Sequence, residues 1–242
     1  MFIRITCFFL LLCSLKSSGQ NQSVPAASYI FFDAIIGVEN TDLHYGKVYQ
    51  EQHRNKSKKT KFFPVTGFNL GAVVFNDLPY FNVPLKYNVY DDELLMQVDK
   101  KWGGDVLQLY KNQVYSFKID GHSFIRINAS NLKKGFYEVA LKKQNISLYI
   151  KHKKSIKQRL DSKLVFYEFD DQERQYFLFY KNTYYVLEKV SDLFAIFSKY
   201  ETEIKHFEKE QDSKILFETR IKNVLEYLDT LLFNEYDKMK PN

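Results

Sequence analysis

The middle of the chain repeats short runs in which apolar and polar residues alternate, and this period of two constrains the fold most. One run places apolar residues on a single side, at Val83, Leu85, Tyr87 and Val89. A second run, Leu94 to Val98, follows the acidic residues 91–93. Alternation interrupted by turn signals is typical of half-buried antiparallel strands. We therefore expect a hairpin here.

The strongest local turn signal is the pair Asp120 and Gly121, which separates the runs Val114–Ile119 and His122–Ile127. A two-residue hairpin loop needs positive φ at both central residues, and Asp-Gly tolerates it. The sequence therefore predicts two paired strands joined by a tight turn at these positions.

Further apolar runs predict the remaining strands. They are Tyr29–Val38, Phe62–Val65, Val106–Tyr110, Phe136–Leu141, Ile146–Ile150, Leu164–Phe169, Tyr176–Tyr180 and Tyr184–Leu187. The last three are expected to form a three-strand meander. Two basic segments, Gln50–Lys61 and Lys151–Arg159, lack periodicity, and we expect both to be exposed loops.

The period changes at Ser191, where apolar residues begin to recur at helical spacing. A first stripe runs from Leu193 to Phe207 and a second from Ile221 to Leu232, with a break near Asp212. We therefore predict an α+β protein: an antiparallel β-meander, as a sandwich or a partly open barrel, with two C-terminal amphipathic helices. Residues 20–190 form the predicted β domain, and residues 191–242 form the helical segment packed on it.

The N-terminus has the order of a secretory signal peptide. Arg4 precedes an apolar run from Cys7 to Leu15, and small and polar residues follow up to Gly19. The run is too short to span a bilayer, which takes about 20 apolar residues. We expect residues 1–19 to be removed before Gln20, leaving no transmembrane segment. The alternative is a lipoprotein with lipid attached at Cys13.

Cleavage before Gln20 would remove both cysteines of the chain, Cys7 and Cys13. The mature chain would then have no disulfide, thiol nucleophile or cysteine-ligated metal. Its formal charge would fall from +6 to +4, because Arg4 and Lys16 are lost. A small positive charge with acids and bases interleaved is typical of a solvated surface, so we expect no nucleic-acid partner.

Few residues are arranged for chemistry. The histidines have no metal-ligand spacing; they are His44, His53, His122, His152 and His206. The clusters Asp91 to Glu93 and Asp170 with Asp171 are interpreted as turns, and they lack the spacing of a calcium loop. No nucleophile elbow or phosphate-binding glycine loop occurs. We therefore assign no catalytic, cofactor-binding or metal residue, and expect no cofactor.

Three segments carry a resemblance: Gly71–Phe75, Leu85–Leu94 and Gly135–Val139. They resemble a set of uncharacterised exported β-rich proteins of the Bacteroidota. The resemblance implies a periplasmic or cell-surface setting and no assigned activity.

These features favour an exported, non-catalytic envelope or periplasmic protein that binds an unidentified protein or envelope ligand. Two alternatives stay open. One is a hydrolase of envelope polysaccharide or peptide, which requires a pocket that gathers at least two of His44, His122, Asp91 and Asp170. The other is a carrier that holds an apolar ligand in a cavity of the curved sheet.

Overall fold

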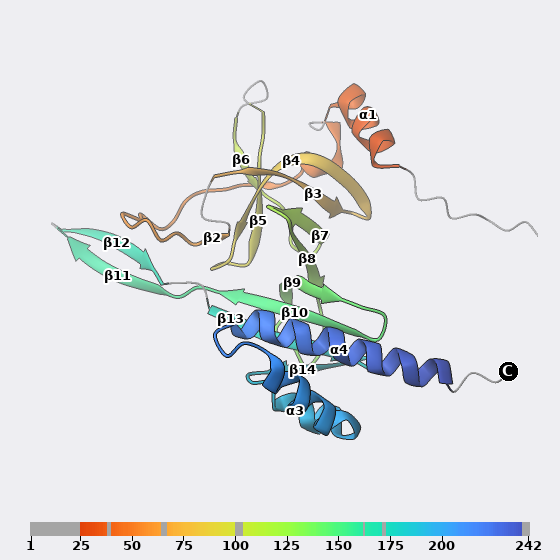
Figure 1. Ribbon diagram of the computed structural model, residues 1–242. Helices are drawn as coiled ribbons and strands as arrows, with labels where there is room; N and C mark the ends of the chain where they lie inside the picture. The colour runs from red at the N-terminus through yellow and green to blue at the C-terminus, as the bar shows by residue number, and fades with distance from the viewer. Residues whose placement is uncertain are drawn as a thin grey trace, which may run out of the picture.

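The computed structural model describes residues 25–37, 40–63, 67–99, 104–161, 163–170 and 173–238. The expected signal peptide, its processing site before Gln20, and Cys7 and Cys13 lie outside the described residues. The described part is an α+β protein in which an antiparallel sheet carries helices near the C-terminus, as the sequence predicts (Figure 1).

The large sheet is open, with β1 at one end of the strand order and β14 at the other. The order is β1-β6-β5-β4-β3-β7-β8-β9-β10-β13-β14, with β2 paired to β4 off this path, and β11 and β12 form a separate two-stranded sheet. Within the described residues the sheet does not close into a barrel. The strands are β1 (Lys47–Val48), β2 (Phe62–Phe63), β3 (Asn69–Phe75), β4 (Leu78–Asn88), β5 (Glu93–Gln97), β6 (Val106–Gln108), β7 (Val114–Ile119), β8 (His122–Ile127), β9 (Gly135–Lys142), β10 (Ile146–Lys153), β11 (Ile156–Asp161), β12 (Leu164–Phe169), β13 (Glu173–Tyr180) and β14 (Thr183–Leu187).

The two hairpins with the clearest sequence signals are confirmed. Strands β7 and β8 have the predicted bounds, and Asp120 and Gly121 between them have φ of 50° and 78°. Strands β4 and β5 pair around residues 89–92, and the alternating residues from Val83 to Val89 are buried. An aromatic cluster forms the core of this half, with Tyr87 packed against Phe117 and Phe124.

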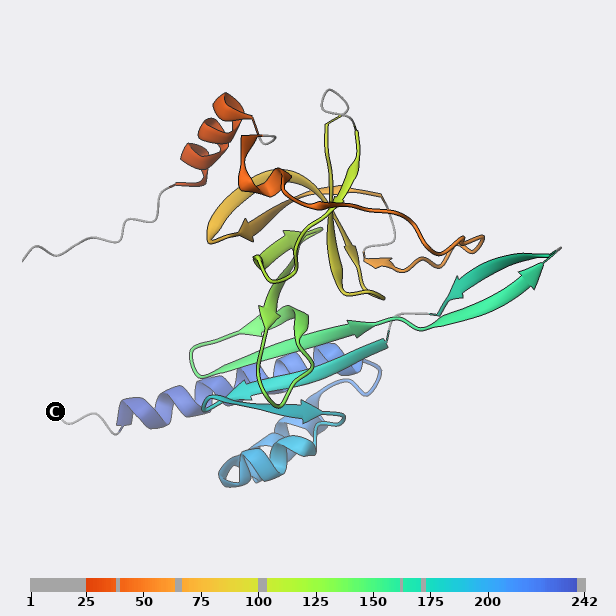
Figure 2. The same cartoon turned by 180° about the vertical axis from the view of Figure 1, so that it is seen from behind.

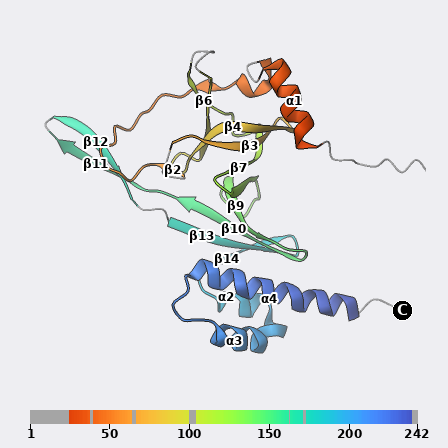
Figure 3. The same cartoon turned by 45° about the horizontal axis from the view of Figure 1, so that its top comes forward.

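The second half of the sheet carries the C-terminal helices on one face. These are α2 (Asp192–Ile196), α3 (Glu201–Glu210) and α4 (Phe217–Lys238), and a short 3-10 turn, η4 (Ser198–Tyr200), joins the first two. Figure 3 shows α4 lying along the sheet, with α3 below α4 in this view. Leu228 of α4 and Leu178 of β13 are fully buried in one cluster with Ile146 of β10. The first predicted helix is thus interrupted near Phe197, while both apolar stripes are buried as expected.

The predicted strand at Tyr29–Val38 is wrong, because the segment forms the helix α1 (Ala26–Ile36). A short, continuous apolar run has no alternation that separates a buried strand from a helix. Pro25 precedes the helix and Gly37, with φ of 83°, follows it, so the helix ends at residues suited to a boundary. Figure 2 shows α1 against the strands of the first half.

The second basic segment is also not a loop. Its first residues continue β10, where Lys151 is buried, and Ile156 begins β11. Consequently β12 pairs with β11 rather than with β13, and the predicted three-strand meander reduces to the hairpin of β13 and β14. Charged residues do not produce the alternation of apolar and polar residues that identifies a half-buried strand. The sequence pattern therefore favoured a loop. The first basic segment contains no strand but ends at the buried Lys61.

Candidate functional site

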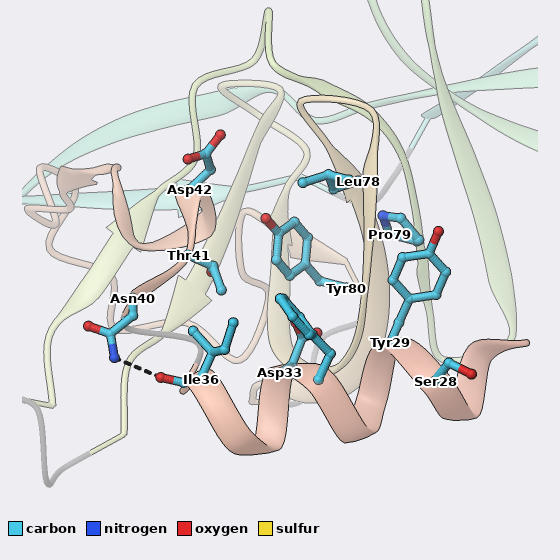
Figure 4. A pocket seen from close by; sticks show the side chains of 11 residues that line it. Ser28, Tyr29, Asp33, Ile36, Asn40, Thr41, Asp42, Leu78, Pro79 and Tyr80 are labelled. Atoms are coloured by element: carbon cyan, nitrogen blue, oxygen red, sulfur yellow. Dashed lines mark hydrogen bonds between the residues drawn. The ribbon is translucent and has the colours of Figure 1, made fainter. Parts of the chain in front are cut away.

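A pocket lies between α1 and the hairpin of β3 and β4, with the short 3-10 helix η2 (Asp42–His44) at its end (Figure 4). Its cavity has a volume of about 510 Å³, within the range of roughly 300–1,000 Å³ that is usual for small-molecule sites. Apolar side chains make up most of its wall: Tyr29, Phe32, Ile36, Leu78, Pro79 and Tyr80.

The helix α1 presents different residues to the pocket and to solvent. Tyr29, Phe32 and Ile36 line the pocket, whereas Phe31 and Ile35 do not. Ile35 is 68% exposed and Ile36 is 36% exposed. A spacing of three to four residues places side chains on one face of a helix, so the pocket takes one face of α1.

Two hydrogen bonds and one buried residue hold the rim of the pocket in place. Asn40 donates from Nδ2 to the Ile36 carbonyl at 2.7 Å, which fixes the chain as it leaves the helix. Asn76, in the turn between β3 and β4, donates from Nδ2 to Asp42 Oδ2 at 3.0 Å. Leu43 is fully buried in the core beneath. The hairpin tip and η2 are therefore tied together on one side of the cavity.

The charged groups that line the pocket are acidic. Asp33 and Asp42 line it, and no lysine, arginine or histidine of the described residues does. Burial raises the pKa of Asp33 above its ordinary value. Burial also raises the pKa of Tyr80, although a hydrogen bond with Thr41 opposes it, and both carboxylates add to the rise. An apolar wall with two carboxylates suits a ligand that has an apolar body and a positively charged group.

Away from this pocket, a buried ion pair joins the two halves of the sheet. Lys151 Nζ of β10 lies 2.8 Å from Asp92 Oδ1 and 2.9 Å from the Phe136 carbonyl. The Tyr87 hydroxyl also donates to Asp92, at 2.6 Å. A Cβ on Gly135 would lie 2.0 Å from Asp92 Oδ2, so this close approach requires glycine. Because of these bonds, we assign the pair of Lys151 and Asp92 a structural role.

Glu138 of β9 accepts hydrogen bonds from two of the histidines. Its Oε1 lies 2.7 Å from His122 Nδ1, and its Oε2 lies 2.5 Å from His152 Nε2. Burial alone would raise the pKa of Glu138, but the histidines outweigh it and lower the pKa to about 2. Burial lowers the pKa of His152, against the opposing effect of Glu138. Phe63 covers both imidazole rings, at 5.1 Å and 5.0 Å between centroids.

Asp91, one of the four residues named for a hydrolase, lies in the exposed turn between β4 and β5. It accepts from Asn88 Nδ2 at 2.7 Å and helps to line a polar groove of about 270 Å³. Lys61 and Glu93 line the same groove, and Lys61 forms an ion pair with Glu51 at 2.7 Å. The polar side chains of the groove therefore already bind one another.

The other histidines and aspartates lie apart from these sites. His53 packs edge-on against Tyr90 and Tyr167. His206 pairs with Glu210 on the exposed side of α3, and His44 belongs to η2 without lining the pocket. Asp170 is exposed and pairs with Lys157 at 3.1 Å, while Asp171 lies outside the described residues.

The structure thus does not bring together the residues that the hydrolase alternative requires. Of His44, His122, Asp91 and Asp170, the apolar pocket contains none and the polar groove contains Asp91 alone. The partner of His122 is Glu138, which the sequence did not single out. Across the described ranges, no group of three or more histidine, aspartate, glutamate or cysteine side chains is placed to hold a metal ion.

The carrier alternative placed its cavity in the curved sheet closed by helices. At that interface the helices pack on the sheet through apolar side chains, among them the fully buried Leu225 and Leu228 of α4 and Leu193 of α2. The apolar cavity lies instead under α1, which the sequence assigned to a strand. Asp33, a lone carboxylate within an apolar run, was the one signal in the sequence for this site.

Comparison with family models, with curated proteins and with solved structures finds no match to this chain. The fold and the pocket therefore define it only as an α+β protein with an open antiparallel sheet and an apolar, acidic pocket between α1 and the β3–β4 hairpin. None of the helices that the structure describes has the length and apolar character needed to cross a membrane.

Proposed function

We propose that this protein is an exported, non-catalytic binding module of the periplasm or cell envelope, whose ligand site is the pocket under α1. The observation that carries the proposal is a cavity of about 510 Å³ with an apolar wall and two carboxylates, Asp33 and Asp42. Export rests on the N-terminal sequence, which has the order of a signal peptide.

The ligand class follows from the lining. Tyr29, Ile36 and Leu78 offer apolar surface to the body of a ligand. Asp33 and Asp42 attract a cation, and no basic side chain in the described part of the chain lines the pocket to neutralise them. A carboxylate in a partly apolar setting loses hydration, and a bound cation compensates for that loss. The pocket therefore takes an organic cation with an apolar chain or ring.

Isothermal titration calorimetry with two probes of equal chain length tests the ligand class. We expect decylammonium to bind at least about tenfold more tightly than decanoate, because hydrogen bonds to charged groups contribute about 1.5–3 kcal/mol. Asp33→Asn should weaken decylammonium by about tenfold and leave uncharged decanol unchanged. Asp77→Asn, in the adjacent turn but outside the pocket lining, is the matched control. Equal binding of decylammonium and decanoate would contradict the proposal.

Export has its own test. N-terminal sequencing of the protein recovered outside the cytoplasm should give a chain that starts at Gln20. A lipid-bearing chain that starts at Cys13 would identify a lipoprotein instead, and a chain that keeps Met1 in the cytoplasm would contradict export.

A further inference from the structure

The hairpin of β11 and β12 projects beyond the large sheet as an arm with a free tip, as Figures 1 and 2 both show. Its two strands pair only with each other in the strand register, from Ile156 opposite Phe169 to Asp161 opposite Leu164. The segment 50–61 runs beside it, where the Tyr167 amide donates to the Arg54 carbonyl at 2.9 Å. We use the term arm for this hairpin together with segment 50–61.

Exposed cations outnumber carboxylates on the arm. The exposed cations are Arg54, Lys56, Lys58, Lys59, Lys157, Arg159 and Lys163. The carboxylates of the arm are Glu51, Asp161 and Glu168, and Asp170 follows directly after the hairpin. Two ion pairs neutralise part of this charge. Lys157 pairs with Asp170 and Arg159 with Glu168, each at 3.1 Å. The arm therefore keeps an excess of positive charge.

One face of the arm gathers these cations around an aromatic ring. Arg159 lies directly opposite Phe166 in the register, so both point to the same face. Lys56 Nζ lies 3.6 Å from the centroid of the Phe166 ring, and Arg54 lies over the same ring at 5.9 Å. Segment 50–61 thus adds its charge to the face that already carries Lys157 and Arg159.

Exposed aliphatic side chains flank the turn at the tip of the arm, and the turn itself carries Lys163. Leu160 is 76% exposed and lies directly opposite Val165, so both point to the face of the hairpin away from Arg159, and Leu164 is also exposed. Large aliphatic side chains at the end of a projecting hairpin cost free energy in water. Sulfates or carboxylates of a soluble polymer would leave these side chains in water, whereas the acyl boundary of a bilayer would bury them.

We propose that the arm docks the protein onto an anionic lipid surface. The Leu160, Leu164 and Val165 side chains enter the boundary between headgroups and acyl chains, and the surrounding lysines and arginines contact the headgroups. An apolar element flanked by basic residues binds the membrane interface through both contributions, and each Lys or Arg near an anionic surface adds about 1 kcal/mol. The proposal stands independently of the ligand pocket, which lies under α1.

Vesicle flotation of the full chain tests the proposal. We expect vesicles of phosphatidylglycerol mixed with phosphatidylcholine to bind the protein, and phosphatidylcholine vesicles to bind it much more weakly. Raised salt should weaken the binding by screening the charges. Binding of both vesicles to the same extent, or of neither, would overturn the proposal.

Variants locate the contact. Leu160→Ser should weaken vesicle binding by about tenfold or more, because it removes apolar area that the bilayer would bury. Leu216→Ser is the matched control, since Leu216 is 74% exposed but lies outside the arm. Lys56→Gln with Lys163→Gln should weaken binding by about thirtyfold at low salt, whereas Lys118→Gln with Lys209→Gln should not.

The remaining outcomes also decide the proposal. Equal effects of Leu160→Ser and Leu216→Ser would overturn it. If dextran sulfate in solution binds the chain with the same affinity as the vesicles, and Leu160→Ser changes neither affinity, the arm is a site for an anionic polymer and the lipid proposal fails. Because Leu160 is exposed, its substitution leaves the fold intact, and circular dichroism checks this.

Discussion

The Lys151 ammonium lies 2.8 Å from the Asp92 carboxylate, and both side chains are largely buried where the two halves of the sheet meet. Asp92 belongs to the turn between β4 and β5, whereas Lys151 lies on β10. Burial lowers the pKa of Lys151, and its Asp92 neighbour opposes that effect. The pair therefore connects elements that are far apart in the sequence and leaves neither charge without a partner.

Removal of one member of this pair should destabilise the protein strongly. Lys151→Met removes the buried ammonium partner of Asp92 and leaves Lys111, at 3.0 Å, as its remaining cation. We expect a loss of about 1.5–3 kcal/mol in the free energy of unfolding. Urea unfolding at neutral pH measures it. Asp91→Asn, a change at the exposed neighbour of Asp92 in the same turn, should cost less than about 1 kcal/mol. Equal losses for the two variants would show that the buried pair has no special contribution.

Acid should destabilise the fold through Glu138. Its folded pKa of about 2 lies below its ordinary value of 4.5, so its contribution is present above the ordinary pKa and is lost as pH falls from 4.5 toward 2. His152, whose pKa is lowered by burial, acts in the same direction, because its stabilising effect declines as pH falls below its ordinary pKa. Thermal unfolding across this pH range should show a steadily falling midpoint.

Glu138→Gln separates this contribution from general acid unfolding. The variant should be less stable at neutral pH and should lose less of its remaining stability between pH 4.5 and pH 2 than the original protein. A variant with the same pH profile as the original protein would rule out Glu138 as a source of the acid sensitivity.

The C-terminal helices should be part of the cooperative fold. Leu228 is fully buried between α4 and the sheet, so Leu228→Ala should cost about 2–5 kcal/mol and lower the midpoint of a single unfolding transition. Leu216→Ala, at an exposed position, should be close to neutral. Truncation after Val190 should expose the apolar sheet face and cause aggregation. A soluble, monomeric and cooperatively folded truncated protein would instead make the helices a separate tail.

The sequence predicted those parts of the fold that local signals determine. Asp120 and Gly121 specify a turn by their tolerance of positive φ, and residues 83–89 specify a buried strand face by alternation. The helix at Ala26–Ile36 was mistaken for a strand, because its apolar run has no clear period. Lys151 was assigned to a loop, because only the distant Asp92 makes its burial favourable.

The candidate site was less predictable than the fold. The site combines Asp42 and Tyr80 with Asp33, which lies on the helix that the sequence pattern predicted as a strand. No spacing in the sequence indicates that these three residues share one pocket. The Glu138 pair with His122 and His152 was missed for the same reason, since the three residues come from three different strands.

The affinity of decylammonium for two neighbouring isoleucine variants tests the ligand site most directly. Ile36 lines the pocket and Ile35, the preceding residue of the same helix, does not, so the same substitution changes the pocket wall in one variant alone. By calorimetry, Ile36→Ser should weaken binding by about tenfold, and Ile35→Ser should stay within about twofold of the original protein. Equal weakening by the two variants, or no weakening by Ile36→Ser, would contradict the assignment of the pocket as the ligand site.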